Sequence, residues 1–141
     1  MDIETMLAEA EIAKMLTVYA WALDNKDIET SMGLFAEDVR FDYSELSYPA
    51  ISGKSAVREF FLKQVHTSDE AAFSSLTNKR IDVKGDTATG GDYFMHYSYK
   101  DLGSSNPKRT YVEGQHFYEF VKTEGAWKIR SMRVHITWQA G

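Results

Sequence analysis

The second half of the chain consists of four long runs with the composition of β-strands, and this block constrains the fold more than any other feature. The runs cover about residues 72–84, 87–100, 109–122 and 126–138. Short turn sequences, KGD at 84–86 and TEG at 123–125, join the first run to the second and the third to the fourth. A longer loop at 101–108 joins the middle two. Because turns this short connect antiparallel neighbours, we predict a four-stranded antiparallel meander.

The first half is predicted to be mainly helical. Residues 3–23 carry apolar side chains at the spacing of one helix face: Ile12, Met15, Leu16, Tyr19 and Leu23. Asp27 is the expected N-cap of a second, short helix with Ile28, Met32 and Phe35 on one face. A strand is expected at 37–43 and a third helix at 54–65. Helices that precede a meander predict an α+β fold, in which they pack on the concave face of a curved sheet and enclose a pocket.

Length and charge narrow the functional classes. A chain of 141 residues is the size of one domain, and a net charge of -5 argues against a nucleic-acid partner. No apolar run approaches the roughly 20 residues of a membrane span, and the acidic start MDIETMLAEAE does not read as a signal peptide. We therefore expect a cytoplasmic protein without membrane contact. The absence of cysteine excludes disulfides, thiolate catalysis and cysteine-based zinc sites.

Several segments, in this order and spacing, resemble the SnoaL-like branch of the nuclear transport factor 2-like superfamily, closest in pattern to the scytalone-dehydratase group. They read YAWALDNKDIETSMGLFAEDVRFDY, ISGKSAVREFF, TNKRIDVKGDTATGGDYF and EGAWKIRSMRVHITW. The resemblance covers nearly the whole chain. It implies a single domain over 1–141 with a cone-shaped, cystatin-like α+β fold. The same fold hosts dehydratases, isomerases, cyclases, epoxide hydrolases and non-catalytic proteins, so it does not fix one reaction.

The resemblance also implies roles for four residues. Tyr43 matches the tyrosine with which the dehydratases activate a water, and Tyr19 matches the oxyanion-hole tyrosine of ketosteroid isomerases. Asp24 matches an aspartate beside the dehydratase pocket, and His116 matches a polar pocket residue in both groups. These matches imply a catalytic site that faces the cavity of the cone.

The sequence departs from the dehydratase pattern at its two essential histidines. The first should fall near Phe73 or Ser74, where there is none, and the second near Ser98, whereas His96 lies two residues earlier on the same strand face. Scytalone dehydration therefore cannot be transferred directly. An Asp-Arg-Asp triad of the epoxide-hydrolase type cannot be assembled from this sequence either.

Read from the residues alone, the two tyrosines are either core residues or hydrogen-bond donors. Tyr43 alternates in phase with Val39 and Phe41, so it is expected inside, whereas Asp42 is expected to face the other way. Tyr19 lies on the apolar helix stripe. Phenols fixed in a dry pocket can stabilise the negative charge that develops on a substrate carbonyl or enolate oxygen.

Asp24 has two readings. It either caps the turn between two helices or orients a histidine and abstracts a proton itself. At about 3.6 residues per turn, it lies about 140° from Tyr19 around the helix. We therefore predict that it reaches the pocket only if the helix unwinds at LDNK.

His96 and His116 are the candidate acid–base pair. Phe94, His96 and Ser98 share one strand face, and we expect that face to line the cavity. Two imidazoles near a carboxylate form a general acid–base set, although a structural role for each stays open. A zinc site with Asp24 is less favoured, and His66 and His135 are expected outside the site. The opposite face carries Tyr93, Met95, Tyr97 and Tyr99, which a second subunit is expected to cover.

Taken together, the sequence favours an enzyme without metal or organic cofactor: a lyase or isomerase of dehydratase or cyclase type. Its substrate would be small, hydrophobic and oxygenated, polycyclic or aromatic as in polyketides. The expected catalytic residues are Tyr19, Asp24, Tyr43, His96 and His116. The expected substrate-binding residues are Trp21, Phe94, Ser98, Met132, Val134 and Trp138. A non-catalytic small-molecule-binding or accessory domain is the alternative, and a homodimer, or else a trimer, is the expected assembly.

Overall fold

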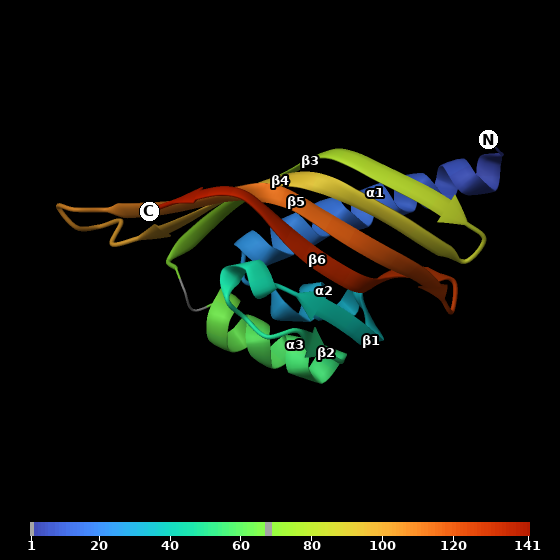
Figure 1. Ribbon diagram of the computed structural model, residues 1–141, viewed down its shortest axis with the longest axis horizontal. Coiled ribbons are helices and arrows are strands. Elements are labelled where there is room, and N and C mark those ends of the chain that lie inside the picture. Colours follow the sequence, from blue (N-terminus) through green and yellow to red (C-terminus); the bar gives the residue numbers. More distant parts are fainter. Residues whose placement is uncertain (1, 67–68) are drawn as a thin grey trace.

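A curved six-stranded sheet in the order β2-β1-β6-β5-β4-β3 is the main layer of the molecule (Figure 1). The computed structural model describes residues 2–66 and 69–141. The strands are β1 Phe35–Asp42, β2 Ile51–Ser52, β3 Ala71–Lys84, β4 Thr87–Lys100, β5 Lys108–Thr123 and β6 Ala126–Ala140. Strands β3 to β6 form the predicted antiparallel meander. The sheet is mixed, because β1 pairs with β6 in parallel.

The helices come before the meander, as predicted for an α+β fold. Helix α1 spans Ile3–Asp24 and packs against β3, whereas α2, Ile28–Gly33, and α3, Lys54–Phe60, lie toward the β1 edge of the sheet (Figure 1). The third helix does not continue regularly to residue 65 as expected. Its last turn, Phe61–Val65, is a π-helical turn, which places Phe61 among the core aromatic rings.

Aspartate caps begin the first two helices. Asp2 accepts a hydrogen bond from the backbone N of Thr5 at 2.8 Å, and Asp27, as predicted, accepts one from the backbone N of Thr30 at 3.1 Å. Helix α2 ends at Gly33, so the expectation that Phe35 belongs to its apolar face is wrong. Phe35 begins β1 instead, because its ring packs into the core, 5.8 Å from Tyr19 and 5.0 Å from Phe41 between ring centroids.

A β-bulge between β5 and β6 changes which way the end of β6 faces. Gly114 pairs with Ile136, but Glu113 pairs with Trp138, so Thr137 is the extra residue. The alternation of side chains is reversed beyond it, and Trp138 points to the outer face of the sheet. The close approach of the strands requires glycine, because a Cβ at position 114 would lie 1.9 Å from the backbone oxygen of His135.

We therefore predict that Gly114→Ala lowers the free energy of unfolding by about 3 kcal/mol, since backbone rather than a flexible side chain blocks the new methyl group. Chemical denaturation would measure the change. Gly103→Ala is the matched control, because a Cβ there has no neighbour within 4 Å. Equal stability of the two variants would contradict the close packing at the bulge.

Within the described ranges, no helix combines the length and the apolarity that a membrane-spanning segment needs.

Candidate active site

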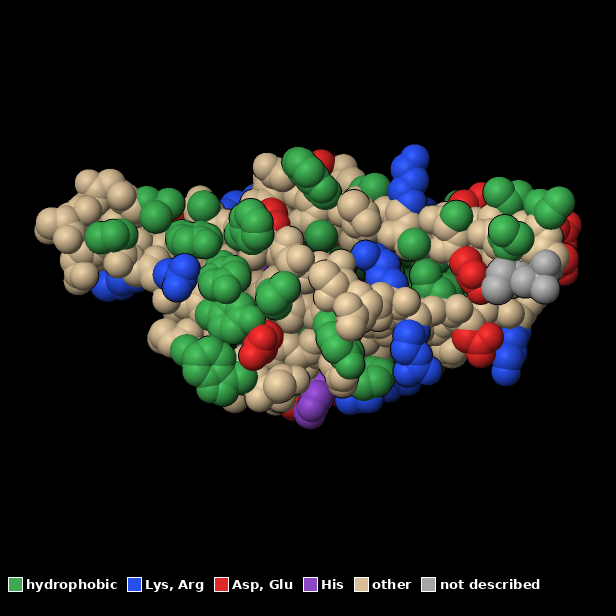
Figure 2. Space-filling view, turned by 90° about the horizontal axis from the view of Figure 1, so that it is seen from above, with side chains coloured by type: hydrophobic (Ala, Val, Ile, Leu, Met, Phe, Trp, Pro, Cys, Tyr) green, Lys and Arg blue, Asp and Glu red, His purple; other side chains and the backbone are tan. Residues whose placement is uncertain are grey.

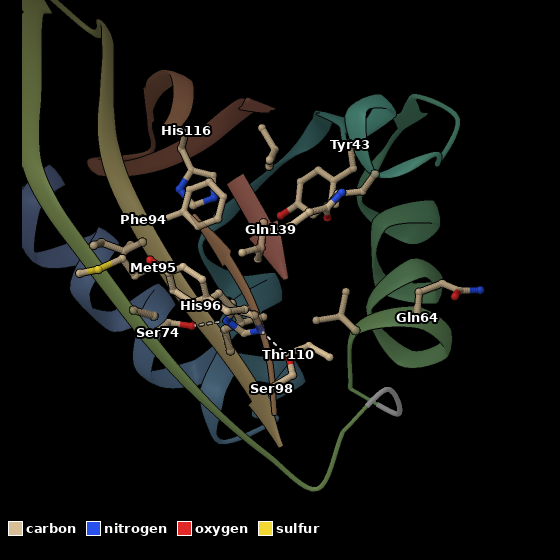
Figure 3. A pocket seen from close by; sticks show the side chains of 18 of the residues that line it. Tyr43, Gln64, Ser74, Phe94, Met95, His96, Ser98, Thr110, His116 and Gln139 are labelled. Carbon is tan, nitrogen blue, oxygen red and sulfur yellow. Dashed lines mark hydrogen bonds between the residues drawn. The ribbon is translucent and has the colours of Figure 1, made fainter. Parts of the chain in front are cut away.

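A cavity of about 650 Å³ lies between the concave sheet face and the helices (Figure 3). Its lining is mainly apolar and aromatic, with a few polar groups on the sheet strands. That composition is typical of a small-molecule pocket, in which convergent polar atoms orient a largely hydrophobic ligand. His96 and His116 both line this one cavity.

His96 is joined to Asp24 through Ser74. The Ser74 hydroxyl lies 2.6 Å from Nδ1 of His96 and 2.6 Å from Oδ1 of Asp24, and the second carboxylate oxygen accepts the backbone N–H of Ser74 at 2.7 Å. On the other side of the ring, the Ser98 hydroxyl lies 3.2 Å from Nε2 (Figure 3). The carboxylate, the hydroxyl and the imidazole thus form one hydrogen-bonded chain that ends at Nε2 in the cavity.

The number of hydrogens in this chain fixes the tautomer of His96. Ser74 has one hydroxyl hydrogen, and an ionised carboxylate can only accept, so that hydrogen goes to Asp24. In the hydrogen bond between Ser74 and His96, the imidazole must then be the donor, through its Nδ1–H, and the Ser74 oxygen the acceptor. Neutral His96 therefore carries its hydrogen on Nδ1 and presents the lone pair of Nε2 to the cavity, where Ser98 can donate to it.

The surroundings of His96 also favour the neutral ring. Burial lowers the pKa of His96 below its usual value, the charge of His116 acts in the same direction, and the carboxylates of Asp24 and Asp69 oppose the shift. A histidine that stays neutral around pH 7 with an unprotonated nitrogen in a cavity has the form required of a general base.

His116 is held by a second, separate carboxylate. Its Nδ1 lies 2.8 Å from Oδ1 of Asp92, and the hydroxyl of Tyr118 donates to Oδ2 of the same group at 2.7 Å. The side chain of Asp92 is fully buried. Phe94 stacks on the His116 ring with 4.4 Å between centroids, which leaves His116 one defined orientation at the cavity wall.

Tyr19 and Tyr43 meet over Met132. Their hydroxyls lie 3.9 Å and 3.5 Å from its sulfur. Burial raises the pKa of Tyr43 to about 12 and that of Tyr19 well above its usual value. Both phenols therefore stay protonated at neutral pH and can donate hydrogen bonds in the cavity that they line.

The remaining predicted residues divide into two groups. Phe94, Ser98 and Val134 line the cavity. Met132 does not line it, because its side chain is fully buried behind the two phenols, so its expected contact with substrate is wrong. Trp21 and Trp138 do not line it, so their expected role in the pocket is wrong. Trp21 is 71% exposed, because two residues from Tyr19 correspond to about 200° around the helix. Trp138 is 55% exposed, because the bulge at Thr137 turns it outward.

Asp24 reaches the site in a way that helical phase alone does not indicate. The helix stays regular to Asp24 and is capped by Asn25, so the expected unwinding at residues 23–26 is wrong. The carboxylate does not line the cavity itself. It bonds to Ser74 on the neighbouring β3, and through Ser74 it acts on His96.

Ser74, Asp92 and Tyr118 are the site residues that sequence reasoning missed. Ser74 occupies the region where the resemblance placed a histidine, and its contact with Asp24 depends on how α1 packs on β3. Asp92 had a signal in the sequence, because it alternates in phase with Phe94 and His96 and therefore shares their face. Nowhere in the described part of the chain do three His, Asp or Glu side chains gather as a metal site would require.

Comparisons with known proteins agree with this fold. Residues 4–133 match the family model of a SnoaL-like domain. No curated protein sequence was found to match. That residues 1–141 form a single domain stays a prediction.

Three solved structures share the fold. A protein of Novosphingobium aromaticivorans assigned as an aromatic ring hydroxylase is 27% identical, with 94% of this chain and 91% of that chain covered and a TM-score of 0.82. A protein of the same organism assigned as a scytalone dehydratase is 21% identical, with coverage of 96% and 88% and a TM-score of 0.85. A type 2 hexachlorocyclohexane dehydrochlorinase, LinA, is 12% identical, with coverage of 99% and 92% and a TM-score of 0.86.

Proposed function

Because the chain belongs to the SnoaL-like domain family of the nuclear transport factor 2-like superfamily, we propose that it is a small-molecule lyase or isomerase that works by acid–base chemistry without a metal or organic cofactor. The observation that carries the proposal is the Asp24–Ser74–His96 chain, which presents an unprotonated imidazole nitrogen, in contact only with the Ser98 hydroxyl among the described residues, to an apolar cavity. Two of the structural neighbours are named for eliminations, a dehydratase and a dehydrochlorinase, and an elimination begins with such a base.

In the proposed mechanism, Nε2 of His96 removes a proton from a carbon beside a substrate carbonyl. The electron pair moves toward the carbonyl oxygen, and Tyr43, which lies with Tyr19 against Met132, donates to that oxygen. Return of the proton at another carbon gives isomerisation, whereas departure of a leaving group gives elimination. Attack of the enolate carbon on a second carbonyl of the substrate, whose oxygen then takes the proton, gives cyclisation. Asp24 acts through Ser74, since it keeps the Nδ1 hydrogen in place and stabilises the imidazolium that forms.

Proton exchange tests this proposal without knowledge of the natural substrate. Planar ketones with acidic C–H bonds, such as 2-tetralone, would be screened for binding by thermal shift, because a ligand of the folded state raises its stability. Bound ketones would then be incubated in D₂O with the protein. We expect loss of the C–H signal in ¹H NMR faster than in buffer. If every ketone that binds exchanges only at the buffer rate, the protein is instead a non-catalytic binding domain.

We also propose that a second copy of the chain covers the outer sheet face. This face carries exposed large apolar side chains, among them Phe73, Tyr93, Phe117 and Trp138. Figure 2 shows hydrophobic side chains gathered toward the end of the molecule that holds the β4–β5 connection. The ring of Tyr111 contacts those of Tyr97 and Trp138 on this face, and such a patch is larger than isolated exposed residues produce.

Analytical ultracentrifugation would measure this assembly. We expect a dimer, and we expect Trp138→Lys to weaken it by about 30-fold in Kd, because a buried tryptophan is a frequent hot spot. Trp21→Lys is the matched control, since Trp21 is also exposed but lies on α1. A wild-type protein that sediments as a monomer at tens of micromolar would contradict the proposed interface.

A further inference from the structure

Asp92 is a buried carboxylate for which the proposed base mechanism has no use. Its side chain is fully buried, at the centre of β4, and its two oxygens are taken by His116 and Tyr118. Placing an ionised carboxylate in the interior costs free energy unless its hydrogen bonds are satisfied. The arrangement indicates a defined role for the group that Asp92 holds.

That group is the imidazole of His116, which Asp92 holds through Nδ1. The contact of Nδ1 with the Asp92 carboxylate requires a hydrogen on Nδ1, so the neutral ring has its lone pair on Nε2. The ring lines the cavity, and no hydrogen bond within the described residues engages Nε2. Phe94 on one side and Tyr118 beyond it restrict the ring, at centroid distances of 4.4 Å and 5.5 Å.

The two histidines serve different parts of the cavity. His116 lies opposite Asp92 in the sheet, and Asp92 precedes His96 by four residues on β4, which corresponds to about 13 Å along the strand. Phe94 lies between them on the same face (Figure 3). The two imidazoles therefore enter the cavity from positions that are well separated along the strands.

We propose that Asp92 and Tyr118 are positioning residues that hold His116 as a second acid–base group, with Nε2 the acceptor for a hydroxyl of the bound ligand. The proposal deepens the proposed function, because His96 would act on a carbon while His116 contacts an oxygen elsewhere on the ligand. The carboxylate of Asp92 stabilises a proton that Nε2 takes up from that hydroxyl, and the phenol of Tyr118 keeps the carboxylate aligned.

Nitrogen NMR of histidine-labelled protein tests the proposal, with His116→Asn and His96→Gln used to assign the signals. We expect His116 in its Nδ1–H form, and we expect phenol, as a probe, to shift the Nε2 signal of His116. Toluene has the same shape without the hydroxyl and should leave that signal in place. Equal responses to phenol and toluene would overturn the proposal.

Two variants separate positioning from simple packing. Asp92→Asn, whose amide no longer demands a hydrogen on Nδ1, should shift His116 toward the Nε2–H form and weaken phenol binding by about tenfold. Tyr118→Phe removes one hydroxyl, so it tests the same point if the asparagine variant does not fold, with an expected three- to tenfold loss. Tyr93→Phe, on the exposed face, is the control and should bind phenol as wild type does. Wild-type affinity in the folded Tyr118→Phe variant would contradict the role assigned to that residue.

This test can fail independently of the proposed function. If bound ketones do not exchange faster than in buffer but His116 responds to phenol, the enzymatic proposal is wrong and the role of Asp92 and Tyr118 stands. If ketone exchange is accelerated but phenol leaves the His116 signal unaffected, the role proposed for Asp92 and Tyr118 is wrong and the enzymatic proposal stands.

Discussion

Replacing His96 with glutamine is expected to slow carbon-proton exchange in bound ketones by about 10³-fold. The glutamine side chain has a similar length and retains polar atoms near Ser74 and Ser98, but its amide cannot accept a proton near neutral pH. The exchange rate in D₂O, measured at saturating ketone, reports this loss. Thermal denaturation would establish that the variant remains folded.

His135→Gln is the matched control for that experiment. His135 lies on the opposite face of β6, where its side chain is half-exposed and bonds to Glu45. Exchange at the wild-type rate is expected for this variant. Loss of exchange in both variants, or in neither, would contradict the assignment of His96 as the base.

The pH dependence of exchange gives an independent check on the same residue. Because burial lowers the pKa of His96, the neutral form persists below the usual histidine value of about 6.5. The rate should therefore fall only at pH values lower than that. The free energy of unfolding should also fall at low pH. As the pH falls below about 6.5, His96 takes up a proton more readily in the unfolded chain than in the folded chain, and this difference destabilises the folded state.

The substitution Asp92→Ala is expected to lower the free energy of unfolding by about 3–5 kcal/mol. It removes the acceptor of two donors on buried side chains, Nδ1 of His116 and the Tyr118 hydroxyl. Chemical denaturation followed by circular dichroism measures the change. Tyr118→Phe, which removes one of the two hydrogen bonds, should cost only about 1 kcal/mol.

Asp86→Ala provides the comparison at an exposed aspartate. Asp86 lies in the turn between β3 and β4, where its side chain is exposed to solvent, so a change within about 0.5 kcal/mol is expected. A loss of stability at Asp92 no larger than at Asp86 would show that the buried carboxylate does not organise its surroundings.

The sequence was sufficient for features that depend on local periodicity. The alternation that placed Tyr43 inside with Phe41, and the helical stripe that buried Tyr19, both agree with the structure, where these residues are largely buried and line the cavity. The two short turns predicted the hairpins of the meander, because glycine in the left-handed region occurs in both, at Gly85 and Gly125.

The residues whose positions the sequence patterns predicted wrongly are placed by irregular or long-range features of the structure. Trp138 follows the alternation of Met132 and Val134 in the sequence, and only the extra residue Thr137 reverses it. A bulge of one residue leaves no trace in a period-two pattern. The role of Asp24 depends on the packing of α1 against β3, fifty residues away from it in the chain.

Asp92 illustrates a different limit. Its alternation with Phe94 and His96 could have placed it on the inner face, but an aspartate in a strand is usually assigned to the surface. Its burial follows from the partners that β5 supplies, His116 directly opposite and Tyr118 two residues further. Pairing across strands, and not the sequence of β4 alone, decides that such a carboxylate can lie inside.

The tautomer of His96 tests the central claim most directly, since the base mechanism requires an unprotonated Nε2 in the resting protein. Long-range ¹H–¹⁵N correlation spectra of histidine-labelled protein distinguish the two neutral forms. We predict the Nδ1–H form for His96 in the wild type and a shift toward the Nε2–H form in Ser74→Ala, where the acceptor of the Nδ1 hydrogen is lost. The Nε2–H form in the wild-type protein would contradict the account.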